Sequence, residues 1–265
     1  MPQRNIKIAL LPIDIIPFNP EANLDMVNSR LAGLDSDTDL VVLPETFTTG
    51  FTPRTDILQE VSEDDTGNTV RRLKEMSNER NVALWGSYMA TDGDGHFFNR
   101  GFMIAPGEEP LFYNKRHLFS HGGESRVLTH GTELAPIVEF RTWRLKMSIC
   151  YDIRFPVWNR AIANNYDVLI VPANWAHSRY YAWKQMLIAR AIENQTYVMG
   201  CNREGFDLYG DYNRYDSCAF NYWGKDMADK RQDGTIYAVL DAEQFNTDRQ
   251  RFAPWHDADT FTLNI

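Results

Sequence analysis

Short apolar runs rich in branched residues alternate with amphipathic segments along the chain, which predicts buried strands separated by surface helices. Residues 6–11 and 39–43 are typical of buried strands, and residues 21–34 between them carry leucine and valine at helical spacing. Further strands are predicted at 82–89, 97–104, 111–114, 136–140, 144–149, 167–171, 196–201, 217–223 and 235–240. Further helices are predicted at 66–80, 156–164, 181–194 and 244–252.

Local signals refine this pattern at several points. Thr66 is the candidate N-cap of the second predicted helix, and Pro156 suits the first turn of the third. Residues 120–134 show no clear period and contain two adjacent glycines, so we expect a long surface loop, which is a frequent place for functional residues. Cys150 directly follows a predicted strand, and its thiol is therefore expected at the end of that strand.

The order of these elements predicts the fold class. Strands and helices alternate in both halves of the chain, but antiparallel-looking strand pairs interrupt the alternation. A mixed α/β fold with two sheets covered by helices fits this order better than a doubly wound parallel sheet. No linker-like or low-complexity run divides the chain, so we expect one domain over residues 1–265, with a core at about 5–242 and a C-terminal extension at 243–265.

Composition and charge exclude several classes of function. The chain has a net charge of −9 and no basic run longer than two residues, so it lacks the basic face that a nucleic-acid partner requires. No stretch approaches the about 20 apolar residues that span a membrane, and the first residues lack the apolar core of a signal peptide. Three widely spaced cysteines predict no disulfide framework and favour a reducing cytoplasm.

Four residues carry candidate chemistry. Cys150 lies between a strand and a turn, where a thiol is exposed and free N–H groups of the turn can stabilise an oxyanion. Glu45 follows a buried strand, Lys115 follows another, and Glu124 lies in the long loop. A lysine lowers the pKa of a neighbouring thiol, and a carboxylate at the carboxyl end of a strand lies where α/β proteins place ligands. Taken singly, a free cysteine is more often buried and inert, and Glu45 and Lys115 are more often solvated. Glu124 taken singly is about as often a surface charge as a functional residue.

Taken together, the segments around these four residues favour a functional role over an inert or solvated one. Residues 43–46 (Leu-Pro-Glu-Thr), 114–119 (Asn-Lys-Arg-His-Leu-Phe) and 149–156 (Ile-Cys-Tyr-Asp-Ile-Arg-Phe-Pro) resemble the three signature segments of the carbon–nitrogen hydrolase (nitrilase-like) family, in order and in spacing. Residues 124–131 are similar to the loop that carries a second glutamate in that family, and 171–175 and 189–195 are similar to its later segments. The resemblance extends from residue 6 to about residue 240.

This resemblance implies a fold, a mechanism and a set of roles. The implied fold is a four-layer α-β-β-α sandwich that pairs into a homodimer or a larger homo-oligomer. Glu45 would act as general base, Cys150 as the nucleophile that forms a thioester, and Lys115 together with the N–H of Tyr151 as the oxyanion site. Glu124 would position the lysine and the substrate amide. The implied mechanism requires no cofactor and no metal, and the six histidines show no metal-ligand spacing.

The sequence of the nucleophile segment narrows the range of candidate substrates. Nitrilases usually have Cys-Trp-Glu where this chain has Cys-Tyr-Asp, and the whole segment looks most like that of ω-amidases, which hydrolyse the terminal amide of 2-oxoglutaramate and similar compounds. The carboxylate of such a substrate requires a cation or several N–H donors, and Arg154 is one candidate. A structural role, in which Arg154 pairs with Asp152 or with a loop carbonyl, fits the sequence equally well. The candidate pocket walls are Tyr151, Trp175 and Phe47.

Two alternatives remain open at this stage. One is an N-carbamoyl- or ureido-acid amidohydrolase of the same family, which would also take a small-molecule amide as its partner. The other is a family member that binds a metabolite without turnover, and the intact set Glu45, Lys115, Glu124 and Cys150 disfavours it.

Overall fold

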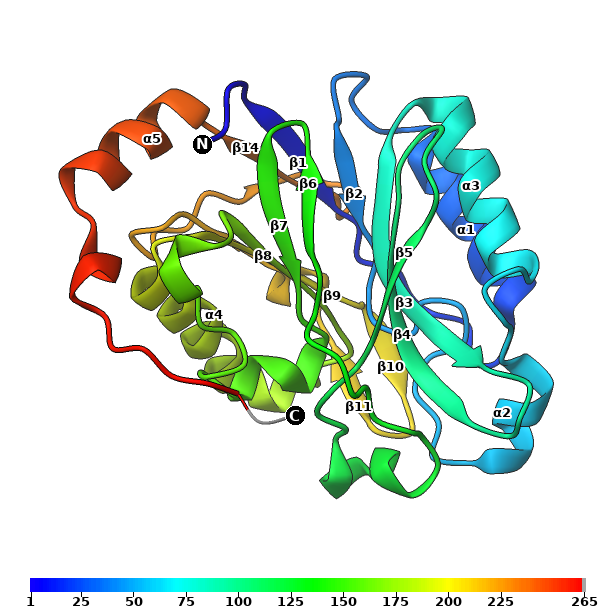
Figure 1. Ribbon diagram of the computed structural model, residues 1–265. Helices are drawn as coiled ribbons and strands as arrows, with labels where there is room; N and C mark the ends of the chain where they lie inside the picture. Colours follow the sequence, from blue (N-terminus) through cyan, green and yellow to red (C-terminus); the bar gives the residue numbers. More distant parts are fainter. Residues whose placement is uncertain (264–265) are drawn as a thin grey trace.

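Two β-sheets packed face to face form the centre of the protein, described here from a computed structural model over residues 1–263 (Figure 1). Residues 264 and 265, the end of the expected extension 243–265, lie outside the described residues. The larger sheet contains β13 (Asp229–Lys230), β14 (Ile236–Leu240), β1 (Ile6–Leu10), β2 (Leu40–Val42), β3 (Ala83–Thr91), β4 (Phe97–Ile104) and β5 (Leu111–Asn114), in that order. The smaller sheet contains β12 (Cys218–Phe220), β9 (Tyr197–Asn202), β8 (Val168–Ala173), β7 (Trp143–Met147) and β6 (Ile137–Phe140).

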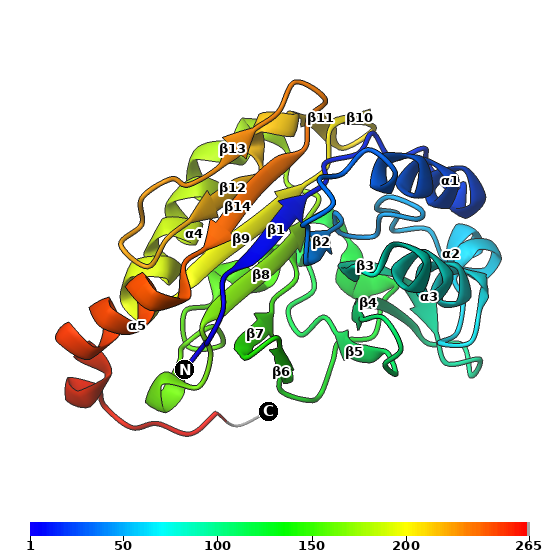
Figure 2. The ribbon, with the colours of Figure 1, turned by 90° about the horizontal axis from the view of Figure 1, so that it is seen from above.

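Helices cover the outer faces of both sheets. In Figures 1 and 2, α1 (Pro20–Leu31) and α3 (Asn68–Arg80) lie outside the larger sheet, and α4 (Tyr180–Asn194) lies outside the smaller one. The helix α2 (Thr55–Val61) lies near the end of the larger sheet, and α5 (Ala242–Arg251) follows β14. A separate hairpin is formed by β10 (Gly205–Asp207) and β11 (Gly210–Tyr212).

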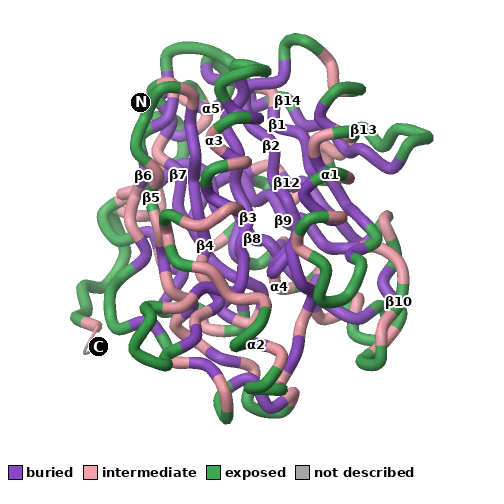
Figure 3. Tube along the Cα trace, turned by 90° about the vertical axis from the view of Figure 1, so that its right-hand side faces the viewer, coloured by how far each residue is buried: buried purple, intermediate pink, exposed green. Residues whose placement is uncertain are grey.

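Apolar side chains on both faces of the strands hold these layers together. Ile8 and Leu10 of β1 belong to the core between the two sheets, whereas Ala9 between them belongs to the core under α1 and α3. Side chains of a strand alternate between its two faces, so a continuous apolar run fills two cores at once. Strands β2, β8 and β9 are accordingly buried along their whole length (Figure 3).

The predicted fold class is confirmed, because the layers run α-β-β-α from one side of the molecule to the other. Most strands and helices lie within a few residues of their predicted positions. Within residues 1–263, no helix is long and apolar enough to cross a membrane.

Three local predictions were wrong, and two elements were missed. Thr66 does not cap α3; its side chain and its N–H both donate to Asp64, and Gly67 occupies the N-cap position. Residues 156–164 do not form an α-helix, because Ala163 and Asn164 adopt positive φ angles of 49° and 57°. Helix α2 and the β10–β11 hairpin were not predicted, since neither has a clear apolar period. The strand before Cys150 ends at Met147 rather than at residue 149.

The strands that matter for the site end at the same edge of the two sheets. β2 and β3 are parallel in the larger sheet, and β7 and β8 are parallel in the smaller one. The chain leaving β2 meets the chain leaving β8, where the N–H of Glu45 donates to the carbonyl of Ala173 at 3.4 Å. This is the edge at which open α/β sheets place their ligands.

A close backbone approach beside β5 is expected to limit substitution at Gly131. Its N–H donates to the carbonyl of Lys115 at 2.9 Å, and a Cβ at this position would lie 2.1 Å from the carbonyl oxygen of Asn114. Backbone atoms cannot move aside as a side chain tip can, so we expect Gly131→Ala to lower the free energy of unfolding by about 1–3 kcal/mol. Urea unfolding measures this change.

Gly33→Ala is the matched control, because its new Cβ would have no neighbour closer than 3.7 Å. Equal stability of the two variants would contradict the tight contact at Gly131.

Candidate active site

A sharp turn presents Cys150. The residue is separated from the end of β7 by two residues and begins a 3₁₀ turn over Cys150–Arg154, with a positive φ of 44°. A non-glycine residue in this conformation is strained, and such strain concentrates at functional sites. The side chain is 7% exposed, at the floor of a cavity rather than on the open surface.

Asp152 holds this turn in place. One carboxylate oxygen accepts from the N–H of Ile149 at 3.1 Å and from the hydroxyl of Tyr113 at 3.0 Å. The other accepts from the N–H of His117 at 2.9 Å and lies 2.8 Å from its ring Nδ1. A fully buried carboxylate with four partners fixes the backbone on both sides of Cys150.

Lys115 connects two carboxylates beneath the cysteine. Its Nζ donates to Oε1 of Glu45 at 2.7 Å and to both carboxylate oxygens of Glu124 at 3.0 and 2.9 Å. Its backbone continues the sheet beyond β5, since its N–H donates to the carbonyl of Asn99 at 2.9 Å. The residue is 2% exposed, and both carboxylates are also buried. A buried ammonium ion is stabilised only by such close opposite charges.

Glu45 joins the two sheets. Its chain leaves β2 of the larger sheet, while its Oε2 accepts from the N–H of Asn174, which follows β8 of the smaller sheet, at 2.8 Å. Its other oxygen accepts from Lys115 and from the side-chain amide of Asn99 at 2.8 Å. The carboxylate therefore has a fixed orientation, as a group that transfers protons at a defined atom requires.

Glu124 lies in the loop that was predicted over residues 120–134, but it is 1% exposed. Gly123 precedes it with a φ of 85°, which turns the chain so that the carboxylate points inward. Its Oε2 accepts from the N–H of Phe119 at 2.5 Å, and its Oε1 accepts from the amide of Asn99 at 3.1 Å.

Charge determines the resting state of the lysine. Burial alone would lower the pKa of Lys115, but the negative charges of Glu124 and Glu45 outweigh burial and raise that pKa well above its ordinary value. Lys115 is therefore an ammonium ion over the whole physiological pH range, able to stabilise a negative oxygen next to Cys150.

Whereas Lys115 favours its charged form, the thiol of Cys150 favours its neutral form. Burial raises the pKa of Cys150, the charge of Glu45 raises it further, and Lys115 opposes them without compensating. The resting residue is a neutral thiol. Attack on a carbonyl carbon consequently requires a base that removes the thiol proton as the bond forms, and a buried carboxylate beside the thiol is suited to this task.

Two connected cavities meet at Cys150. The arginine pocket, about 300 Å³, is lined by Phe119, His121, Cys150, Tyr151, Arg154, Asn174, Trp175 and Arg179. The carboxylate pocket, about 260 Å³, shares five of these residues and is lined in addition by Glu45, Phe51, Lys115, Gly122, Glu124, Tyr209 and Tyr212. A substrate that occupies both cavities would place its reacting carbon at the junction.

The structure brings seven of the eight residues expected from the sequence to this junction. Phe47 is the exception, and its expected role as a pocket wall was wrong. Its N–H donates to the carbonyl of Ser87 on β3 at 3.0 Å, which continues the sheet and turns the ring away from Cys150. The ring is fully buried and lies 6.0 Å from the ring of Phe102 in the core under the helices.

Arg154 does not pair with Asp152. Asp152 is occupied by the groups around the turn, while the guanidinium of Arg154 lies 5.8 Å from the ring of Tyr151 and 5.2 Å from that of Trp175. Over residues 1–263, the ion pairs of the structure include neither Arg154 nor Arg179.

Three further residues belong to the site and were not predicted. Asn99 donates to both glutamates, Asn174 supplies a backbone donor to Glu45, and Arg179 lines both cavities. A polar residue inside the apolar strand 97–104 was a usable signal for Asn99. Arg179 precedes a helix like many surface arginines, and the sequence gives no reason to single it out.

Comparison with known proteins agrees with this geometry. The carbon–nitrogen hydrolase family model matches residues 7–250. Omega-amidase YafV of Escherichia coli (strain K12) is 37% identical over 260 residues, covering 97% of this chain and 98% of that protein. The 2-oxoglutaramate amidase of Bacillus subtilis (strain 168) is 31% identical, covering 89% of this chain and 91% of that protein.

A solved structure is similar to this chain over nearly its whole length. XC1258 from Xanthomonas campestris, a CN-hydrolase superfamily protein with an arsenic adduct in its active site, superimposes with a TM-score of 0.91 at 31% identity, over 99% of this chain and 100% of that chain. The chain belongs to the carbon–nitrogen hydrolase family. Within it, the chain is an omega-amidase-like, cysteine-dependent hydrolase of carbon–nitrogen bonds other than peptide bonds.

The raised pKa of Cys150 gives a testable pH dependence. A thiol with a raised pKa stays protonated as the pH rises through the ordinary thiol value of about 8.5, so we expect no thiolate from Cys150 below that pH. Ionisation of Cys150 is measured as the difference in ultraviolet thiolate absorbance between the wild type and Cys150→Ser as the pH is raised. A thiolate that forms near neutral pH would contradict the charge balance described above.

Proposed function

We propose that the chain releases ammonia from the terminal amide of a small dicarboxylic acid monoamide, of the 2-oxoglutaramate or 2-oxosuccinamate type. The observation that carries this proposal is the pair Arg154 and Arg179, which line the arginine pocket beside Cys150 and form no ion pair within residues 1–263. Arginine binds carboxylates through two parallel hydrogen bonds, so this pair suits the free carboxylate of such a substrate. The activities of the E. coli and B. subtilis relatives support the same substrate class.

The proposed reaction begins with proton transfer. Glu45 takes the thiol proton as the sulfur of Cys150 attacks the amide carbon, and Lys115 with the N–H of Tyr151 stabilises the resulting oxyanion. The carbon–nitrogen bond breaks, Glu45 returns the proton to the leaving nitrogen, and ammonia departs from the thioester. Glu45 then activates water, which releases the acid and regenerates the thiol.

Glu124 has a supporting role in this proposal. Its two hydrogen bonds to Lys115 and its contact with Asn99 keep the ammonium group directed at the junction of the two cavities. A lysine held by two carboxylates loses little freedom when the oxyanion forms, which lowers the barrier by preorganisation.

The location of the protein, its oligomeric state and its domain organisation are also proposals. A cytoplasmic location is supported by three free and buried cysteines. A homodimer is supported by the exposed apolar side chains of Tyr181 and Ile192 on α4. A single domain over the whole chain is supported by the ion pair of Arg249 in α5 with Asp167, the residue directly before β8, at 2.7 Å.

The reaction is tested by ammonia release from 2-oxoglutaramate and succinamic acid. We expect Cys150→Ala to reduce turnover to background and Glu45→Gln to lower kcat by about 10²–10⁴-fold, since the general base is lost. Cys218→Ala, a change of a buried cysteine outside both cavities, is the control and is expected to keep its activity. Turnover by Cys150→Ala at the wild-type rate, or cleavage of N-carbamoyl acids only, would contradict the proposal.

The arginine pair is tested with two substrates of similar shape. Succinamic acid carries the distal carboxylate, and butyramide has a methyl group in its place. We expect Arg179→Gln and Arg154→Gln each to raise KM for succinamic acid by about tenfold or more, because charge-assisted hydrogen bonds contribute on the order of 1.5–3 kcal/mol. Neither change should affect butyramide, and Arg126→Gln on the exposed loop should affect neither substrate. Equal losses with both amides would contradict carboxylate binding.

A further inference from the structure

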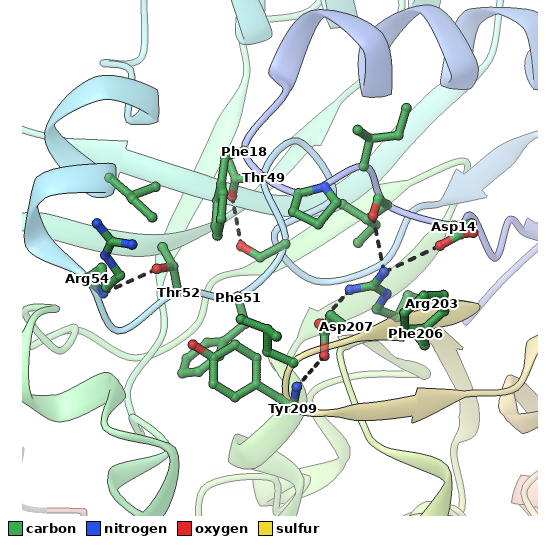
Figure 4. Close-up of a pocket in the computed structure, with 16 residues that line it drawn as sticks. Asp14, Phe18, Thr49, Phe51, Thr52, Arg54, Arg203, Phe206, Asp207 and Tyr209 are labelled. Carbon is green, nitrogen blue, oxygen red and sulfur yellow. Dashed lines mark hydrogen bonds and ion pairs between the residues drawn. The ribbon is translucent and has the colours of Figure 1, made fainter.

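A third and larger cavity adjoins the active site. This apolar pocket, about 510 Å³, lies between residues 14–18, residues 49–57 and the β10–β11 hairpin (Figure 4). Much of its wall is apolar, including Ile15, Ile16, Phe18, Ile57, Phe206 and Leu208. The mechanism proposed above uses none of these side chains.

Two aromatic rings separate this pocket from the site. Phe51 and Tyr209 line both the apolar pocket and the carboxylate pocket. Their ring centroids are 5.0 Å apart in an edge-to-face contact, and Figure 4 shows them side by side at the border of the pocket. Tyr209 lies at the tip of the hairpin and is 44% exposed, so its side chain has room to turn outward and join the two cavities.

The charges in the apolar pocket are matched. Arg203 at its base donates to Asp207 at 2.8 Å and to the carbonyl of Ile15 at 3.2 Å, and it lies 3.6 Å from Asp14. Arg54 at the rim pairs with its neighbour Asp56. The pocket therefore offers an apolar surface without an unmatched charge, unlike the arginine pocket, and a neutral apolar group fits it.

The rim of the pocket leaves apolar surface in water. Phe206 is 74% exposed and Leu208 is 96% exposed, both in the hairpin. A bound apolar group would shelter part of this surface, which favours binding at roughly 25 cal/mol for each Å² removed from water.

The orientation of the substrate indicates which part of it would enter the apolar pocket. The distal carboxylate is directed to the arginine pocket, and the carbonyl carbon must lie at Cys150. The leaving nitrogen then points toward Glu45, which returns a proton to it, and Glu45 lies in the carboxylate pocket together with Phe51 and Tyr209. A substituent on that nitrogen would extend past the two rings into the apolar pocket.

We infer that the enzyme also hydrolyses secondary ω-amides whose nitrogen carries an apolar group of about benzyl size, with this group bound in the apolar pocket. The inference rests on the proposed function, because it uses the same nucleophile and the same carboxylate site. Cys150 forms a thioester, the carbon–nitrogen bond breaks, and Glu45 delivers the proton with which the primary amine leaves. Water then releases the dicarboxylic acid, so one water is consumed for each amine formed.

The experiment compares N-benzylsuccinamic acid with succinamic acid and measures benzylamine, ammonia and succinate. The wild type is expected to cleave both. Ile57→Trp fills the pocket from α2, and we expect it to lower kcat/KM for the benzyl amide by about tenfold or more, with succinamic acid unchanged. Leu208→Ser removes an apolar contact at a site too exposed to affect folding, and it should raise KM for the benzyl amide alone. Leu111→Trp, on the exposed side of β5, is the matched control for added bulk.

The outcomes separate this inference from the proposed function. Cleavage of succinamic acid without cleavage of the benzyl amide would overturn the inference and leave the proposed function intact. Equal losses with both substrates in Ile57→Trp and Leu208→Ser would also overturn it, because the pocket would then have no role specific to the nitrogen substituent. Cleavage of neither amide by the wild type would overturn the proposed function itself.

Discussion

The ammonium group of Lys115 between Glu45 and Glu124 is the interaction on which the rest of the site depends. A cation in the interior is tolerated only with close counter-charges, and here two carboxylates provide them. The same contacts orient both carboxylates, so the ion pairs that make the buried charge tolerable also fix the positions of Glu45 and Glu124. Asn99 donates to each glutamate and completes a network in which the cation and both anions have defined partners.

Polarity is divided along the cavities of the protein. Cations without ion-pair partners in the described chain line one end, and a cluster of one lysine between two glutamates lies in the middle. An apolar wall with matched charges lies at the far end. A small acid amide fits the first two regions. The third region distinguishes amides by what their nitrogen carries, so one reaction mechanism can serve substrates that differ only in the leaving group.

Much of the fold and four polar residues of the site were predictable from the sequence. Strand ends follow from apolar runs, whereas Glu45, Lys115, Glu124 and Cys150 were singled out because their segments together resemble those of the carbon–nitrogen hydrolase family, not by their positions alone. Phe47 was placed wrongly because one backbone hydrogen bond to β3 decides which face its ring occupies. Arg179 was missed because its importance arises from a neighbour in space, and sequence spacing does not report such neighbours.

The bond from the N–H of Asn174 to Glu45 has a consequence for biogenesis. Glu45 is synthesised early, Cys150 much later, and the strand that orients the glutamate later still. A nascent chain that stops short of β8 therefore holds a cysteine with no correctly directed base beside it. The thiol and its proposed base are therefore brought together only when both sheets have docked, so a chain cut short before β8 carries the cysteine without the activity.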